Sequence, residues 1–441
     1  MSRRRFRKAL ASAALAACAL AVLAPGGASG RTVAHTAPSV PLGGVNILGL
    51  TYGVRPAEAD QAIALARQLH ARVVRTELSW SVLEPLAPNV VDPQALAFTD
   101  RLVADAAAAG ITVIATIRSS PCWASSAPAA LMSNCSPRRL TAANAWPPTD
   151  PAEYGRFTAY IARRYGTRLA AIEIWNEPDQ SNELYFAGPN KPTRYAAVVR
   201  AAYPAIKQAN AGVPVLAGSL VGSNGTFLRA LYAAGIKGYY DGLAVHFYNL
   251  TLGALRSIRQ VQLANGDAKP LWLDEFGWSN CWPRERVQQE QACVTSRLQA
   301  TDMTDIFRSL AHTRYVAAEV PFELNDYDHE NFGVVTRSGA RKPLFTALAG
   351  VLSSPFGRVT PVTLRLRRRG GHVLASGSGP VGDFMGLEAL KGGRLRYRAL
   401  FTLDRFNRYS IKLPSALGTR GLVVRVFQYW KGSGAAARKQ I

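Results

Sequence analysis

The sequence predicts an α/β fold: a (β/α)8 TIM barrel followed by a small all-β, sandwich-like domain. Between Asn46 and Leu352, short apolar runs alternate with helical stretches, and eight such pairs can be counted. After Pro355, apolar and basic residues alternate with period two in short runs broken by Gly, Pro and Asn. Eight repeats favour a closed barrel over an open sheet, with reactive groups at the carboxyl ends of the strands.

The predicted barrel strands are apolar runs with the length of buried parallel strands. They are Ile47 to Gly53, Val73 to Trp80, Thr112 to Arg118, Ala170 to Trp175, Pro214 to Leu220, Gly242 to Tyr248, Pro270 to Glu275 and Val316 to Leu324. The predicted helices are Pro56 to His70, Pro93 to Ala109, Pro151 to Tyr165, Thr193 to Ala209, Phe227 to Ala234, Leu252 to Ala264, Val287 to His312 and Pro343 to Leu352. Thr149 or Asp150 caps the third helix, with Pro151 in its first turn.

The chain of 441 residues is longer than a barrel of about 250 to 300 residues requires, so we expect a second domain. We divide it into a signal peptide (1–30), a lead-in (31–45), the barrel (46–354), a small basic β domain (356–430) and a flexible tail (431–441).

The N-terminus has the composition of a secretory signal peptide. Basic residues from Arg3 to Lys8 precede an apolar run from Ala9 to Ala24, and small residues follow Pro25. The run is short for a membrane span of about 20 residues. We therefore expect a secreted, extracellular protein. The competing interpretations are a retained N-terminal anchor and a lipoprotein modified at Cys18.

The four remaining cysteines suit an exported chain. Cys122 is close to Cys135 in the sequence, and Cys281 is close to Cys293. Four cysteines allow three pairings, and sequence neighbours are the favoured partners. Buried free thiols are the alternative interpretation.

The formal charge of +23 is concentrated in the second domain. From Phe356 onward, 17 Lys and Arg face only three acidic residues. Outside a cell, such a module could hold an anionic glycan or wall polymer by long-range attraction. A solvated face produced by compositional bias is the alternative. We expect no nucleic-acid partner, because no recognition motif is present.

Two glutamates end strand-like runs. Glu177 lies in Ile174-Trp175-Asn176-Glu177-Pro178-Asp179, and Glu275 lies in Asp274-Glu275-Phe276-Gly277-Trp278. Splitting an acetal between sugars requires one carboxyl to protonate the leaving oxygen and another to meet the positive charge at the anomeric carbon. This pair therefore indicates a glycosidase. Glu and Asn capping a strand-to-helix turn would be the purely structural interpretation.

The barrel region resembles clan A glycoside hydrolases, and most closely family 39 and its bacterial exopolysaccharide-hydrolase relatives. The resemblance assigns the sugar-hydroxyl contact to Asn176, the general acid/base to Glu177 and the nucleophile to Glu275. It implies retention of configuration, for which two carboxyl groups are typically about 5 to 5.5 Å apart. Asp274 is a rival nucleophile. Its opposite pleat parity suggests that only one of the two neighbours faces the pocket.

Three further residues gain roles from the same resemblance. Tyr248 donates to Glu275, and His246 shares its strand face and lines the cleft. Arg75 keeps Glu275 deprotonated by its permanent charge. Glu77 shares the face of Arg75, so a buried structural ion pair between these two is the alternative.

Aromatic residues provide the usual floor for sugar rings. The candidates are Trp123, Trp278 and Phe322, and each could instead fill the core. Trp123 and Trp278 are the preferred pair. Relatives often carry Trp on the eighth strand, where this chain has Phe322.

We therefore expect a retaining O-glycosyl hydrolase that acts on a β-linked poly- or oligosaccharide by double displacement, with no cofactor or metal, as a monomer. One alternative is a non-catalytic carbohydrate- or cell-wall-binding protein on a barrel scaffold. Another is a transglycosylase with the same site.

Overall fold

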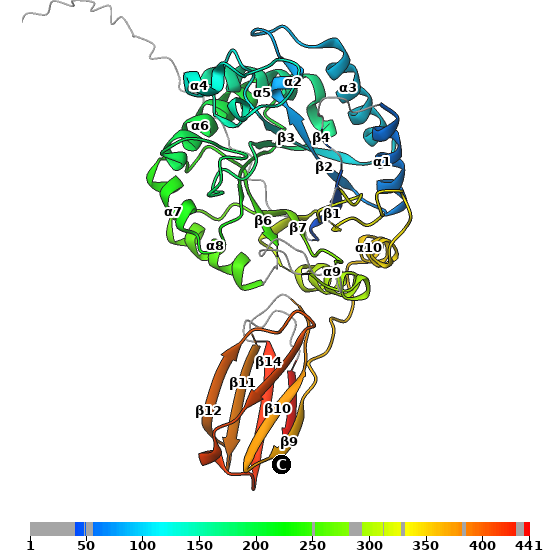
Figure 1. Cartoon of the computed structure of the whole chain (residues 1–441), viewed down its shortest axis with the longest axis vertical. Helices are drawn as coiled ribbons and strands as arrows, with labels where there is room; N and C mark the ends of the chain where they lie inside the picture. Colours follow the sequence, from blue (N-terminus) through cyan, green and yellow to red (C-terminus); the bar gives the residue numbers. More distant parts are fainter. Residues whose placement is uncertain are drawn as a thin grey trace, which may run out of the picture. The chain divides into compact units, whose positions relative to one another are not determined.

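The computed structural model describes residues 40–47, 49, 56–248, 252–281, 293–311, 313–327, 331–381, 385–428 and 436–441. Eight parallel strands close a barrel in sequence order, and helices surround it (Figure 1). Antiparallel sheets follow in a C-terminal β domain. The predicted fold class is confirmed. The predicted signal peptide and most of the lead-in, residues 1–39, lie outside the described residues.

The barrel strands are β1 (Leu42–Asn46), β2 (Val73–Ser79), β3 (Thr112–Arg118), β4 (Leu169–Ile174), β5 (Val215–Leu220), β6 (Gly242–Tyr248), β7 (Leu271–Gly277) and β8 (Val316–Glu319). The α-helices are α1 (Pro56–Gln68), α2 (Trp80–Leu83), α3 (Pro93–Ala108), α4 (Ala129–Met132), α5 (Pro151–Tyr165), α6 (Lys191–Ala209), α7 (Thr226–Ala233), α8 (Leu252–Ala264), α9 (Ser296–Leu310) and α10 (Pro343–Ser353). Short 3-10 helices span Ala142–Ala145, Gly166–Arg168 and Ser415–Leu417.

The first strand differs from the prediction. It is Leu42–Asn46, which lies in the predicted lead-in (31–45) except for Asn46, whereas Ile47 and Gly49 lie outside any strand. The rest of the predicted strand lies outside the described residues. Glycines in this strand hid it, because Gly lowers strand propensity. Here the glycine is required by close packing: a Cβ on Gly44 would lie 1.9 Å from the Val73 carbonyl oxygen.

Helix starts follow their capping residues. The Asp150 carboxylate accepts from the Ala152 N–H at 2.9 Å, so Asp150 rather than Thr149 caps α5. The seventh helix, α9, was predicted too long. It begins at Ser296, after the Thr295 cap, and Cys293 to Thr295 are not helical.

Inside the barrel, side chains form layers along the strands. The lower layer is apolar and includes Val73, Ile114, Ala171, Ala244 and Trp272. Two residues further along the same strands come Arg75, Thr116, Glu173, His246 and Asp274, all buried. Side chains two residues apart on a strand point to the same face of the sheet. These charged and polar side chains therefore form an ionic layer inside the barrel, between the apolar layer and the carboxyl ends of the strands.

The β domain contains β9 (Arg365–Arg369), β10 (His372–Ser378), β11 (Met385–Lys391), β12 (Arg394–Phe401), β13 (Arg408–Lys412), β14 (Leu422–Gln428) and β15 (Ala436–Gln440). The antiparallel sheets have the orders β13-β10-β9 and β12-β11-β14-β15. Val373 and Tyr409 from one sheet share a core with Leu387 and Val424 from the other, which makes a sandwich.

The predicted flexible tail is partly wrong. Residues 436–440 form β15, which pairs with β14 from Phe427↔Ala436 to Val423↔Gln440. The segment Ala-Ala-Arg-Lys-Gln has no β-branched residue, so strand propensity could not reveal it. Backbone pairing with the edge of a sheet supplies the order instead.

Candidate active site

A cavity of about 290 Å³ lies at the carboxyl ends of the barrel strands. Its wall is mostly polar and includes Glu77, Arg118, Glu177, Gln180, Tyr248 and Glu275. Both predicted catalytic glutamates therefore face one space large enough for a sugar ring. The position agrees with the rule that barrel active sites form where strands end.

The turn after β4 holds Glu177 in an unusual backbone conformation. Trp175 and Glu177 have φ values of 66° and 45°, which are rare for residues with a Cβ. Anchors fix the turn: the Trp175 indole donates to the Tyr185 carbonyl at 2.7 Å, and Asp179 accepts from the Gly222 N–H at 2.8 Å. Such strain persists only where surrounding contacts impose it, and it is frequent at functional sites.

The two glutamate carboxyl groups are close together and share a histidine. One oxygen of Glu177, one of Glu275 and a ring nitrogen of His246 all lie within 4.8 Å of one another. The His246 Nδ1 is 2.9 Å from Glu177 Oε1 and 3.5 Å from Glu275 Oε2. Gln180 donates to the other oxygen of Glu177. A substrate atom in the cavity could thus contact both carboxyl groups.

Arg75 is buried and distributes its donors among four partners. Its Nε donates to Glu173 at 2.8 Å, and its Nη1 donates to Glu275 at 3.0 Å. It also bonds the side-chain oxygens of Asn46, at 3.0 Å, and of Asn176, at 2.7 Å. Burial lowers the pKa of Arg75, but the carboxylates of Glu173 and Glu275 outweigh this effect and raise it. Arg75 therefore remains a cation that orients two acids and two amides.

The alternative interpretation, an ion pair between Arg75 and Glu77, is not observed. Glu77 instead accepts from Arg118 Nε at 2.6 Å, on the cavity wall. The strand register explains why Glu77 contacts Arg118. Glu77 on β2 lies opposite Thr116 on β3, and Arg118 is two residues after Thr116 on the same strand. Arg75 contacts Glu275 directly instead of forming a structural ion pair with Glu77.

Tyr248 donates its hydroxyl proton to Glu275 Oε1, as the resemblance implied. Burial raises the pKa of the Glu275 carboxyl, whereas His246, Arg75 and the Tyr248 hydrogen bond oppose that rise. Arg75 thus acts in the predicted direction, but burial outweighs it. Tyr248 itself packs edge-on against Phe322 and Phe332, which fixes its ring.

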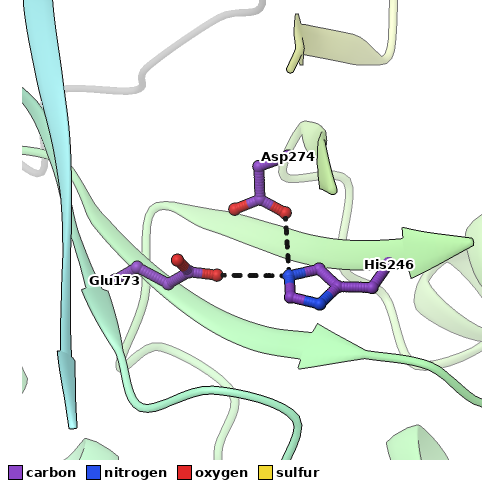
Figure 2. Close-up of side chains that lie close together, drawn as sticks. All are labelled: Glu173, His246 and Asp274. Atoms are coloured by element: carbon purple, nitrogen blue, oxygen red, sulfur yellow. Dashed lines mark ion pairs between the residues drawn. The ribbon is translucent and has the colours of Figure 1, made fainter. Parts of the chain in front are cut away.

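Asp274 and Glu275 both project into the barrel, contrary to the simple alternation expected. Val245 on β6 pairs with Leu273 and His246 with Glu275, so the register shifts at Asp274. A bulge of this kind places two consecutive residues opposite one partner. Glu275 lines the cavity, whereas Asp274 is fully buried below it, 3.6 Å from His246 Nε2 (Figure 2). This separates the nucleophile candidate from its rival.

The predicted aromatic floor is only partly found. Phe322 lines the cavity. Trp123 does not line it: it donates from its indole to the Glu84 carbonyl and packs edge-on against Trp80. Trp278 is 3% exposed and packs into the core, so it has no surface to offer a sugar. Position after a strand end could not separate a rim residue from core filler.

The cysteines pair as predicted. Cys122 bonds Cys135, and Cys281 bonds Cys293. Each bridge closes a short loop that begins just beyond the carboxyl end of β3 or β7. The bonds therefore lie on the same side of the barrel as the cavity.

Several functional positions were missed. Glu173, Asn46, Gln180, Tyr185 and Arg118 contact the glutamates, Arg75 or the cavity. Glu173 could have been found, because a charged residue at an inward position of a barrel strand requires a buried partner. Gln180 and Tyr185 lie on a loop, and no sequence periodicity reports where a loop side chain points.

Among the residues that the structure describes, two clusters have enough ligand atoms for a metal: Glu173, His246 and Asp274, and Glu177, His246 and Glu275. The Arg75 guanidinium is 2.8 Å from Glu173 and 3.0 Å from Glu275. Its permanent charge would repel a cation at either place. The geometry therefore suits ion pairing better than metal binding.

Solved structures share this fold. A family 39 glycoside hydrolase from the gut symbiont Bacteroides cellulosilyticus is similar with a TM-score of 0.55 and 17% identity, over 86% of this chain and 80% of that one. The family 39 enzyme from Xanthomonas axonopodis gives a TM-score of 0.52 and 16% identity, over 86% and 93%. A family 30 endoxylanase from Clostridium papyrosolvens gives 0.51 and 14%, over 89% and 97%.

No curated protein sequence matches this chain. Residues 152–342, which include both glutamates, match the family model described as glycosyl hydrolase catalytic core. The predicted resemblance is confirmed: the barrel of this chain is similar to the catalytic core of glycosyl hydrolases.

Proposed function

We propose that this protein is a retaining O-glycosyl hydrolase in which Glu177 is the general acid/base and Glu275 is the nucleophile. The main observation in support is that both carboxyl groups face one cavity, with oxygens within 4.8 Å of each other. Retaining enzymes place their carboxyl groups about 5 to 5.5 Å apart, whereas inverting enzymes need about 6.5 to 9.5 Å for a water molecule. The short separation supports double displacement.

In the first step, a Glu275 oxygen attacks the anomeric carbon, and the leaving oxygen takes the proton of Glu177. In the second, the Glu177 carboxylate removes a proton from water, which attacks the same carbon and releases Glu275. Arg75 and Tyr248 each hydrogen-bond Glu275, so its carboxylate is aimed before substrate arrives. Two inversions give net retention.

The direct test is trapping with activated 2-fluoro glycosides of several stereochemistries, followed by peptide mapping. We expect one glycosyl adduct on Glu275. The substitution E275Q should abolish the adduct and turnover, E177Q should slow hydrolysis of sugars with poor leaving groups most, and E153Q on α5, outside the cavity, should change neither. Glycan binding without release of reducing ends or aglycone would establish the binding-protein alternative instead.

We propose a β-linked poly- or oligosaccharide as substrate, by the same resemblance, and a secreted monomer as the working form. Two disulfides support an oxidising compartment. Among the described helices, none has the length and apolar character to cross a membrane. Detection of the mature chain in culture supernatant, and its elution at 47.5 kDa or slightly less in size exclusion, would test both points.

We also propose that the three-stranded sheet of the β domain contacts an anionic glycan. Strands β9, β10 and β13 contain no acidic residue, and Arg365, Arg367 and Lys412 alternate outward on them. The other sheet carries Glu388, which pairs with Arg398 at 2.8 Å. Replacing the three outward cations by Ser should weaken retention on an anionic glycan column and make the remaining retention less dependent on salt, because fewer ion pairs are left to screen.

The matched control replaces Arg394, Arg396 and Arg398 on β12 by Ser, which removes the same charge from the other sheet. Equal weakening by both triple variants would show a non-specific charge effect rather than recognition by one sheet.

A further inference from the structure

The ionic layer beneath the catalytic glutamates contains an acid pair that the proposed reaction does not use. Glu173 on β4 and Asp274 on β7 are both fully buried and point at the same ring nitrogen of His246 (Figure 2). Glu173 Oε1 is 3.9 Å and Asp274 Oδ1 is 3.6 Å from His246 Nε2. Neither acid lines the cavity, so neither can touch substrate.

The two acids have unequal surroundings. Glu173 accepts from Arg75 Nε at 2.8 Å and also from the hydroxyls of Thr116 and Ser219. Within the described part of the chain, neither carboxyl oxygen of Asp274 has a hydrogen-bond partner, and Arg75 Nε is 3.8 Å away. A buried carboxylate requires donors, so this cluster stabilises a negative charge on Glu173 and not on Asp274.

His246 connects this layer to the proposed acid/base. Its Nδ1 is 2.9 Å from Glu177 Oε1, and its Nε2 faces the two buried acids. At 3.6 and 3.9 Å neither acid hydrogen-bonds Nε2, so negative charge in this layer favours a second proton on the ring through electrostatic attraction. The protonation of His246 therefore depends on whether the layer below supplies negative charge.

We propose that Glu173 is a positioning residue, the buried carboxylate that keeps His246 protonated on both nitrogens, while Asp274 remains a neutral acid beside it. This inference rests on the proposed function. After Glu177 gives its proton to the leaving oxygen, it is a carboxylate that accepts from the His246 Nδ1–H until it takes a proton from water. Glu173 thus acts on the catalytic cycle through His246.

The electrostatics of the other charged groups agree. The groups that face His246 are Arg75 on β2, Glu173, Glu177 and Asp179 on and after β4, and Asp274 and Glu275 on β7. Burial lowers the pKa of His246, but Glu275, Glu173 and Glu177 outweigh this effect and the opposing charge of Arg75, and they raise it.

The acids themselves shift in opposite directions. Burial and the neighbouring Glu173 charge raise the pKa of Asp274 well above its ordinary value. Burial would also raise the pKa of Glu173, but the charges of Arg75 and His246 reverse the direction. The opposite directions agree with a pair in which Glu173 is the more readily ionised acid.

Nitrogen-15 NMR of the imidazole rings in the full chain measures the protonation of His246 directly. The chain has six histidines, and His246→Gln identifies the signal of interest by its loss. We expect wild-type His246 to stay doubly protonated well above the ordinary histidine pKa of about 6.5. E173Q should lower its titration midpoint by about 1 to 3 pH units, the effect of an opposite charge at this range. D274N, an equally buried matched control, should leave the midpoint unchanged.

The alkaline limb of kcat/KM, which reports the proton on Glu177, should move in E173Q and stay in place in D274N. Three results would each overturn the proposal: a singly protonated wild-type ring at pH 6.5, an unchanged midpoint in E173Q, or an equal downward shift in D274N. The wild-type titration decides even if E173Q fails to fold. The NMR titration does not require the protein to turn over a substrate. It therefore tests the role of Glu173 independently of the glycosidase proposal.

Discussion

The hydroxyl of Tyr248 offers the sharpest test of how Glu275 is prepared. Tyr248→Phe removes one donor and leaves the ring, which packs against Phe322 and Phe332. A hydrogen bond to a charged group contributes about 1.5 to 3 kcal/mol. If that energy is expressed in the transition state, kcat/KM should fall by about 10-fold to 100-fold.

The same substitution has a predicted pH signature. The hydrogen bond from Tyr248 lowers the pKa of Glu275, against the upward effect of burial. Removing the bond must raise the pKa further, so less Glu275 is ionised at a given acidic pH. The acid limb of kcat/KM should therefore move to higher pH, by about 1 unit for each 1.4 kcal/mol lost.

Initial rates with an aryl glycoside between about pH 4 and 9 would measure both effects. Tyr203→Phe is the matched control, because its hydroxyl also contacts a carboxylate, that of Asp241 at 3.1 Å, away from the cavity. The control should keep the wild-type profile. If Tyr248→Phe keeps kcat/KM within about twofold and the acid limb in place, the hydrogen bond does not prepare the nucleophile.

Three other outcomes follow from the structure. The double substitution C122S/C135S should lower the free energy of unfolding in urea by about 3 kcal/mol, because the lost bond closes a loop of 13 residues; a loss below about 1 kcal/mol would contradict this. Arg156→Leu should cost about 1 to 3 kcal/mol in the same assay, since the buried Glu84 carboxylate loses a partner at 2.5 Å, and an unchanged midpoint would refute it. Phe322→Ala should lower kcat/KM about fivefold by removing an aromatic wall of the cavity, whereas an unchanged value would exclude Phe322 from the sugar site.

Local sequence features predicted most barrel elements because they act within a few residues. Asp150 and Pro151 mark the start of α5, and α8 spans the residues predicted. The errors came where a distant segment supplies the stabilisation. Gly44 is in a strand because the Val73 carbonyl packs against it, and β15 exists because β14 offers an edge.

The same division holds for the site. The position of Glu177 and Glu275 at one cavity could be predicted, because the end of a barrel strand and a recognisable motif both lie in short stretches of sequence. Trp278 could not be assigned to the core from its position after a strand, since burial depends on what packs over it. The bulge at Asp274 was equally hidden, because register is a property of two strands.

The amino-acid sequence by itself determined the order of strands and helices, the strand ends that carry acids and the cysteines available to pair. The tertiary structure alone decided which charges meet: Arg75 with Glu173 and Glu275, Glu77 with Arg118, and His246 between two layers of acids. The physical reason is range. Propensity and capping act between neighbours in sequence, whereas burial and ion pairing depend on distances that exist only after the barrel closes.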